Sequence, residues 1–227
     1  MKTMGAATLL AAGLAVVAAA GQDQTRNSRL FPPEDLGLLE APDRDEWQMP
    51  EQIMDALRIA DGAVVADLGV GSGWFTVRLA RRVGPNGLVY AEDVQPEMLQ
   101  ATQRRVQREG LRNVIQVLGT QDDPKLPPGA IDAVLIVDIY HEIADPVALL
   151  RNVASSLKPN GRIGVVDFGS GAGGPGPPAD QRVDPQVILD DAADAGLQLL
   201  RRETFLPFQY FLILERQADA GARPTDD

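Results

Sequence analysis

The chain has 227 residues, enough for one α/β domain with a sizeable hydrophobic core. With 44% hydrophobic and 23% charged residues, its composition is that of a globular protein and argues against wholesale disorder. A formal net charge of −11 disfavours a nucleic-acid partner, because proteins that bind phosphate backbones use clusters of lysine and arginine. The sequence has no cysteine, which excludes disulfides and cysteine-based zinc sites, and a single histidine, His141, leaves little for a histidine metal cluster.

The first residues have the pattern of an export signal. Lys2 precedes an uncharged, alanine-rich stretch, and the small residues Ala18–Ala20 stand where a signal peptidase cleaves. We therefore expect residues 1–20 to be a signal peptide, the protein to be exported (periplasmic or secreted), and no stable membrane span to remain after cleavage. A leader or anchor that stays attached is the alternative. Residues 21–48 are polar and proline-bearing without sustained periodicity, and are expected to form an arm.

Strand and helix signals then alternate over residues 49–216, which predicts right-handed βαβ units and a parallel sheet covered on both faces. Short apolar runs predict strands at Val64–Leu68, Leu88–Asp93, Val114–Leu118, Ile131–Val137, Arg162–Phe168, Gln198–Thr204 and Gln209–Leu214. Capping signals and apolar periodicity predict helices at Pro50 to Ala60, Trp74–Val83, Pro96–Glu109, Asp145–Leu157 and Asp184–Ala195. Gly169–Pro178 is expected to be a flexible loop at the ligand-binding edge of the sheet, and residues 217–227 a disordered tail.

The most informative segment follows the first predicted strand. The apolar run ends in Asp67, and glycines then fall at alternate positions, Gly69, Gly71 and Gly73. Glycine suits a backbone that must bend tightly and approach a ligand where a Cβ would intrude, and the helix after it points its positive N-terminal end at that ligand. Asp93 ends the second apolar run, where a carboxylate can accept hydrogen bonds from both hydroxyls of a ribose.

The spacing separates two kinds of nucleotide ligand. The dinucleotide fingerprint G-x-G-x-x-G is not met, since its sixth position is Trp74 or Thr76 depending on the start. An acid followed by G-x-G-x-G instead resembles the first motif of the class I S-adenosylmethionine (SAM)-dependent methyltransferases. Three more segments are similar to the family's second strand, fourth strand and the turn before its fifth: Val89–Leu99, Ile131–Asp138 and Leu157–Arg162. The resemblance implies a Rossmann-like, doubly wound sheet of seven strands with an antiparallel last strand, SAM as cofactor, and methyl transfer to a small-molecule or lipid-like acceptor.

The resemblance also implies which residues bind the cofactor. Asp67, Gly69, Gly71 and Gly73 match the loop around the amino-acid portion of SAM. Asp93 matches the acid on the ribose, with its neighbour Glu92 as the alternative. The loop of residues 119–123 corresponds to the one that contacts adenine. Its candidates are Gln121 and Asp122, and a solvated acidic turn is the alternative for this loop.

Residues after the fourth strand are candidates for the chemistry. In methyltransferases this strand end faces the methyl group, so Asp138, His141 and Glu142 are expected to act as a base or to orient the substrate, with Asp138 also near the cofactor. Methyl transfer needs an aligned nucleophile in a dry pocket, and a base if that nucleophile starts protonated. A hydrogen-bonded loop histidine is the plain alternative for His141. Arg44, Trp47 and Gln48 lie where this family often builds a lid over cofactor and substrate, although Trp47 could equally belong to the core.

No metal is expected. Catechol-type methyltransferases hold their metal with acids and an asparagine; Asp138 could match one ligand, but Asp167–Phe168 supplies no asparagine. Two other functions remain open: a catalytically inactive SAM-binding protein of the same fold, and an NAD-dependent oxidoreductase, which the missing third glycine disfavours.

Overall fold

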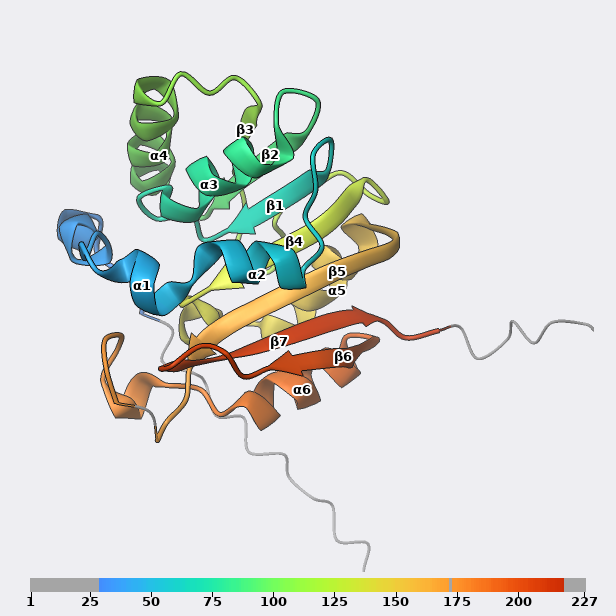
Figure 1. Cartoon of the computed structure of the whole chain (residues 1–227). Helices are drawn as coiled ribbons and strands as arrows, with labels where there is room; N and C mark the ends of the chain where they lie inside the picture. The colour runs from blue at the N-terminus through green and yellow to red at the C-terminus, as the bar shows by residue number, and fades with distance from the viewer. Residues whose placement is uncertain (1–28, 172, 219–227) are drawn as a thin grey trace, which may run out of the picture.

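The computed structural model describes residues 29–171 and 173–218. The expected signal peptide and nearly all of the expected tail lie outside these residues. Seven strands form one sheet in the order β3-β2-β1-β4-β5-β7-β6. The strands are β1 (Val64–Leu68), β2 (Leu88–Asp93), β3 (Val114–Leu118), β4 (Ile131–Val137), β5 (Leu157–Phe168), β6 (Leu197–Glu203) and β7 (Gln209–Arg216). Only β7 runs against its neighbours, pairing antiparallel with both β5 and β6 (Figure 1), which confirms the predicted Rossmann-like sheet.

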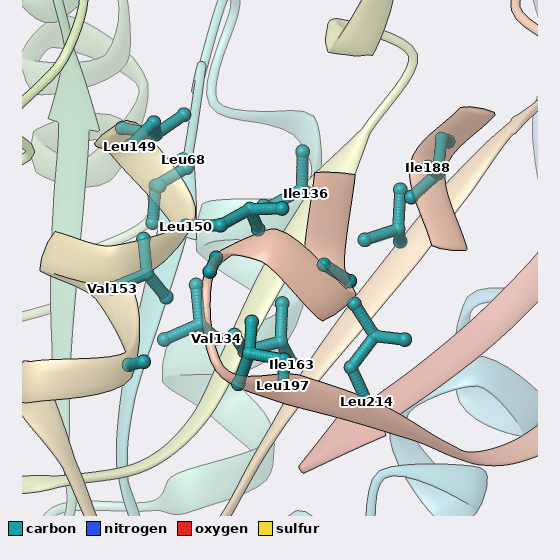
Figure 2. Close-up of a cluster of buried hydrophobic side chains, with 14 of the residues drawn as sticks. Leu68, Val134, Ile136, Leu149, Leu150, Val153, Ile163, Ile188, Leu197 and Leu214 are labelled. Carbon is teal, nitrogen blue, oxygen red and sulfur yellow. The ribbon is translucent and has the colours of Figure 1, made fainter. Parts of the chain in front are cut away.

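Helices cover both faces of the sheet (Figure 1). One face carries α2 (Pro50–Ala56), α3 (Trp74–Val83) and α4 (Pro96–Arg108), and the other α5 (Pro146–Ser156) and α6 (Pro185–Asp194). Successive strand side chains point to opposite faces, so Val65 packs beneath α2 and α3 while Leu68 packs beneath α5, in the cluster that Figure 2 shows. Burial on both faces explains why the central strands are almost continuously apolar.

Two boundaries differ by more than two residues from the predicted ones. Helix α2 ends at Ala56, short of Ala60, because Arg58 takes a left-handed conformation with φ 57° that an α-helix does not accommodate. Strand β5 begins at Leu157, which pairs with Ile131, and a register shift follows before Arg162 pairs with Ala133. The turn that was expected to precede this strand therefore lies inside it.

The expected arm also contains regular structure. A 3₁₀ helix, η1 (Pro33–Leu39), and a one-turn helix, α1 (Arg44–Gln48), precede α2. Each is too short to give an apolar period, and the buried residues of α1 are the polar Arg44 and Gln48, so hydrophobic patterning could not find it. No helix in the described part of the chain is both long and apolar enough to cross a membrane.

Candidate functional site

A cavity of about 1110 Å³ opens at the carboxyl ends of β1, β2, β4 and β5. Two segments border it from outside the sheet: the N-terminal residues from 29 to 47, and the stretch from 175 to 187 after β5. In Figure 1 these are the blue segment and the orange loop beside the strand ends. Ligands of doubly wound sheets bind at this edge.

The glycine loop presents bare backbone to the cavity. Gly69 and Gly71 line it, with φ angles of 68° and 50° in the left-handed region. A Cβ on Gly69 would lie 2.6 Å from Cδ1 and 2.8 Å from Cγ2 of Ile139, so the Ile139 side chain would have to move. Gly73 precedes α3, and a Cβ there would meet Thr102 instead, so this glycine lies outside the cavity lining and serves helix packing.

Two buried acids flank the glycine loop. Asp67 accepts a hydrogen bond of 2.6 Å from Oγ1 of Thr76, and burial raises its pKa to about 7. Asp93 accepts hydrogen bonds from the backbone N–H groups of Gly71 (3.2 Å) and Gln95 (2.9 Å), and burial raises its pKa too. Asp93 thus ties the end of β2 to the glycine loop and keeps acceptor capacity on the cavity side.

The loop after β3 places its two candidates differently. Gln121 lines the cavity together with Thr120. Asp122 is exposed, is not among the lining residues, and its carboxylate accepts a hydrogen bond of 2.8 Å from Oγ1 of Thr120. This geometry matches the solvated acidic turn that was the alternative for this loop, and an adenine contact by Asp122 stays a prediction.

Asp138 belongs to a closed ring of polar side chains, which we call the polar ring: Arg44, Gln48, Gln209 and Asp138. Nε of Arg44 donates to Oε1 of Gln48 over 2.7 Å, and Nε2 of Gln48 donates to Oε1 of Gln209 over 2.9 Å. Nε2 of Gln209 donates to Oδ1 of Asp138, whose Oδ2 lies 3.8 Å from Nη2 of Arg44. Each amide can then be oriented in only one way, so α1 is locked to the ends of β4 and β7.

Asp138 has an unusual backbone conformation and a raised pKa. Its φ is 60°, a left-handed conformation that costs a non-glycine residue energy and is often found at functional sites. Burial, and then the nearby carboxylate of Asp167, raise its pKa to about 7, and Arg44 counteracts them. A carboxylate that faces the cavity and ionises near neutral pH can respond to the charge of a ligand.

Both tryptophans line the cavity. The guanidinium groups of Arg44 and Arg78 lie 4.3 Å and 3.6 Å from the centre of the Trp74 ring. Trp47 packs against Phe168 at 6.0 Å between ring centres. Its side chain thus both lines the cavity and packs on the end of β5.

Glu142 and His141 lie after β4, where the N-terminal segment crosses the cavity. Oε2 of Glu142 accepts a hydrogen bond of 3.0 Å from the backbone N–H of Phe31, and Nε2 of Gln95 donates to the Phe31 carbonyl over 3.1 Å. Nδ1 of His141 is buried and lacks a hydrogen-bond partner among the described residues; it lies 4.0 Å from Oδ2 of Asp167. Burial would lower the pKa of His141, but Asp167 and Glu142 outweigh it and raise the pKa.

The cavity therefore gathers most of the candidates from the sequence, and further residues that the sequence analysis did not select. The gathered candidates are Asp67, Gly69, Gly71, Asp93, Gln121, Asp138, His141 and Glu142. The backbone of Phe31 in the lining was missed, as were Asp167 and Gln209, which are not in the lining but contact His141 and Asp138. Gln209 had a signal, since it is a polar residue at the head of the apolar run of β7. Within residues 29–171 and 173–218, no group of three or more histidine, cysteine or acidic residues could hold a metal ion.

The lining is rich in acid. Seven carboxyl groups, those of Asp67, Glu92, Asp93, Asp138, Glu142, Asp180 and Asp184, face three guanidinium groups, those of Arg29, Arg44 and Arg182. Burial raises the pKa of five of these seven acids, so a ligand with positive charge, which stabilises their ionised forms, is favoured over an anionic one.

Comparisons with known proteins find similarity to methyltransferases. A family model described as a methyltransferase domain matches residues 65–161. An uncharacterised methyltransferase of Mycobacterium tuberculosis is 37% identical over 127 residues, which are 56% of this chain and 48% of that protein. The nocamycin O-methyltransferase of Saccharothrix syringae is 32% identical over 131 residues, 58% of this chain and 44% of that protein. The chain spans about half the length of these curated relatives. A crystal structure of a SAM-dependent methyltransferase from Aquifex aeolicus superposes with a TM-score of 0.78 at 26% identity, covering 82% of this chain and 98% of that one.

Proposed function

Because the chain belongs to the class I SAM-dependent methyltransferases, we propose that it binds SAM in this cavity and catalyses methyl transfer to a small-molecule or lipid-like acceptor. The observation that carries the proposal is the pairing of the bare glycine loop with Asp93. The N–H of Gly71 donates to the Asp93 carboxylate, so the loop and the expected ribose acid meet at one place in the cavity.

The residues present fit SAM. Gly69 and Gly71 leave backbone open where a Cβ would clash or strain the turn, and the acid-rich lining suits a cation. When bound, SAM supplies a methyl group on a sulfonium, and its transfer to a nucleophile leaves the bonding electron pair on sulfur as neutral S-adenosylhomocysteine. The chain's own part is to align the two molecules, exclude water and accept a proton where the nucleophile carries one.

The cavity is large by the standard of ligand pockets. Its volume of about 1110 Å³ exceeds the roughly 300–1,000 Å³ of a typical single-ligand pocket. His141 lies between the carboxylates of Asp167 and Glu142, which stabilise an imidazolium and so favour uptake of a proton from a hydroxyl or amine acceptor. Space beside the cofactor loop and a base at the end of β4 support catalysis over the inactive SAM-binding alternative.

The charge of the lining and the glycine motif both disfavour an NAD-dependent oxidoreductase. The diphosphate of NAD would bring two negative charges into a lining with seven carboxyl groups and three guanidinium groups. The third glycine of the dinucleotide fingerprint is also missing.

Isothermal titration calorimetry of the purified protein with SAM, S-adenosylhomocysteine and NAD tests the proposal. We expect both adenosyl ligands to bind and NAD not to bind. Asp93→Ala should weaken SAM at least tenfold, whereas Asp190→Ala, on the exposed side of α6, should leave affinity unchanged. Binding of NAD alone, or SAM affinity indifferent to Asp93→Ala, would contradict the assignment. SAM binding without turnover over a broad acceptor panel would favour the inactive alternative.

Export of the protein is a separate proposal, supported by the lysine and alanine-rich stretch of residues 2–21. The mass of the protein recovered from its host tests it. A mature chain that begins at Gly21 in an extracytoplasmic fraction is expected, and a full-length chain in the cytosol would contradict it.

A further inference from the structure

One side of the cavity is apolar. Phe168 at the end of β5 packs against Trp47 of α1, and Val183 and Val187 line the cavity from the other bordering segment. The backbone of the loop after β5 closes against this wall, since a Cβ on Gly176 would lie 2.6 Å from the Phe168 ring. Prolines of the same loop, at positions 175, 177 and 178, complete the lining.

Two apolar side chains stand exposed at the edge of the cavity. Leu38 of η1 is 74% exposed and Val187 of α6 is 37% exposed, and both line the cavity. They come from the two segments that border the cavity from outside the sheet. Exposed apolar groups that continue a cavity wall outward mark a surface that an apolar ligand covers.

The charges beside this wall are unfavourable to anions. Arg182 lies 5.2 Å over the Phe168 ring and donates to the carbonyls of Pro177, Gly169 and Pro175, so its N–H groups are used within the loop while its charge remains. Arg44 is engaged in the polar ring. Asp180 and Asp184 add negative charge to the same bordering segment.

We propose that this apolar wall and the edge formed by Leu38 and Val187 bind the methyl acceptor, that the acceptor is an apolar molecule whose reacting end is uncharged or cationic, and that carboxylates and phosphates are excluded. The proposal rests on the proposed function and adds the chemical class of the acceptor. Phe168 follows Asp167, whose Oδ2 lies 4.0 Å from Nδ1 of His141. The N–H of Asp138 donates to the carbonyl of Val166 in the same strand, so an acceptor on this wall has its reacting end near groups that can take a proton.

Three probes with one tail and different heads test the proposal: decan-1-ol, decylamine and decanoate. Because both tryptophans line the cavity, intrinsic fluorescence reports binding directly, measured with S-adenosylhomocysteine at saturation. We expect saturable binding of decan-1-ol and decylamine, and at least tenfold weaker binding of decanoate. Decanoate that binds as tightly as the other two, or no saturable binding of any probe, would overturn the proposal.

Variants locate the site. Val187→Asp should weaken decan-1-ol at least tenfold and change SAM affinity less than twofold. Leu199→Asp is the matched control, because Leu199 is 42% exposed on β6 and does not line the cavity. Asp180→Lys should shift the preference from decylamine towards decanoate several-fold, and less so at high salt, since Asp180 is exposed. Val187→Asp without effect on decan-1-ol would contradict the location.

The two levels of proposal fail in different ways. If calorimetry shows no SAM binding, the proposed function fails whatever the probes do. If SAM binds normally but decanoate equals decan-1-ol, only the acceptor class is wrong.

Discussion

The affinity for SAM should rise with pH between pH 6 and pH 8, because two acids in the cavity ionise in that range. Burial raises the pKa of Asp67 to about 7, and burial together with Asp167 raises that of Asp138 to about 7. Thr76 and Arg44 favour the ionised form of Asp67, and Asp93 opposes it. Arg44 and Gln209 favour the ionised form of Asp138. A cationic ligand binds the ionised forms better, so binding should release protons at neutral pH.

The size of the effect follows from the fraction ionised. A carboxyl group with a pKa of about 7 is about one-tenth ionised at pH 6 and about nine-tenths ionised at pH 8. If one ionised group is required, affinity rises about tenfold over this range, and if both are required the limit is about a hundredfold. S-adenosylhomocysteine lacks the sulfonium charge but keeps the same amino and carboxyl groups. Its affinity should therefore rise less with pH, and this ligand serves as the reference for titration of the amino and carboxyl groups of SAM.

Calorimetry at several pH values, in buffers of different ionisation enthalpy, measures both the affinity and the protons released. Asp138→Asn preserves an oxygen that accepts from Gln209 and removes one titrating group, at the cost of the ion pair with Arg44. This variant should bind SAM about tenfold more weakly at pH 8 and show a shallower pH dependence. Asp190→Asn, which alters an exposed acid outside the cavity lining, should behave as wild type. Flat or falling SAM affinity from pH 6 to pH 8, or an unchanged slope in Asp138→Asn, would refute the reasoning.

Three further perturbations test other parts of the site. Gly69→Ala puts a Cβ against Ile139 at a residue with a left-handed φ, whereas Gly62 has a similar φ but open space around it. In chemical denaturation, Gly69→Ala should therefore lower the free energy of unfolding by about 1–3 kcal/mol more than Gly62→Ala does. Of the two variants, only Gly69→Ala should abolish SAM binding. Gln209→Leu leaves two buried polar partners unpaired and should lower the free energy of unfolding by about 1–3 kcal/mol. Limited proteolysis should then cleave the variant near α1 faster than wild type. Equal protection from cleavage would argue against the role of the polar ring in holding α1 to the sheet. His141 is the chain's single histidine, so NMR can follow the titration of its ring without assignment. The pKa of His141 should exceed 6.5 and should fall in Glu142→Gln. An unchanged pKa in that variant would contradict the charge interaction between His141 and Glu142.

Much of the fold was predictable because its signals are local. Each strand is a short apolar run bounded by glycine, proline or a polar cap, and alternation with helices implies the parallel sheet. The failures have physical reasons. The end of α2 depends on the backbone conformation of Arg58, and the early start of β5 depends on pairing with Ile131, which only the assembled sheet provides.

The candidate site was likewise predictable in part from the sequence. The glycine loop and Asp93 were recognisable because their chemistry is fixed by spacing along the chain. The polar ring was not, because Gln48 and Gln209 are 161 positions apart and meet only when α1 folds back over β7. Asp122 illustrates the converse: a plausible residue type in the right loop, which turns its carboxylate to Thr120 instead of the cavity.

A crystal structure of the protein with S-adenosylhomocysteine would test the central claim most directly. The account predicts the adenosyl group across the glycine loop, with both ribose hydroxyls on the Asp93 carboxylate and the sulfur facing the end of β4. A ligand bound elsewhere, or with its ribose turned away from Asp93, would contradict it.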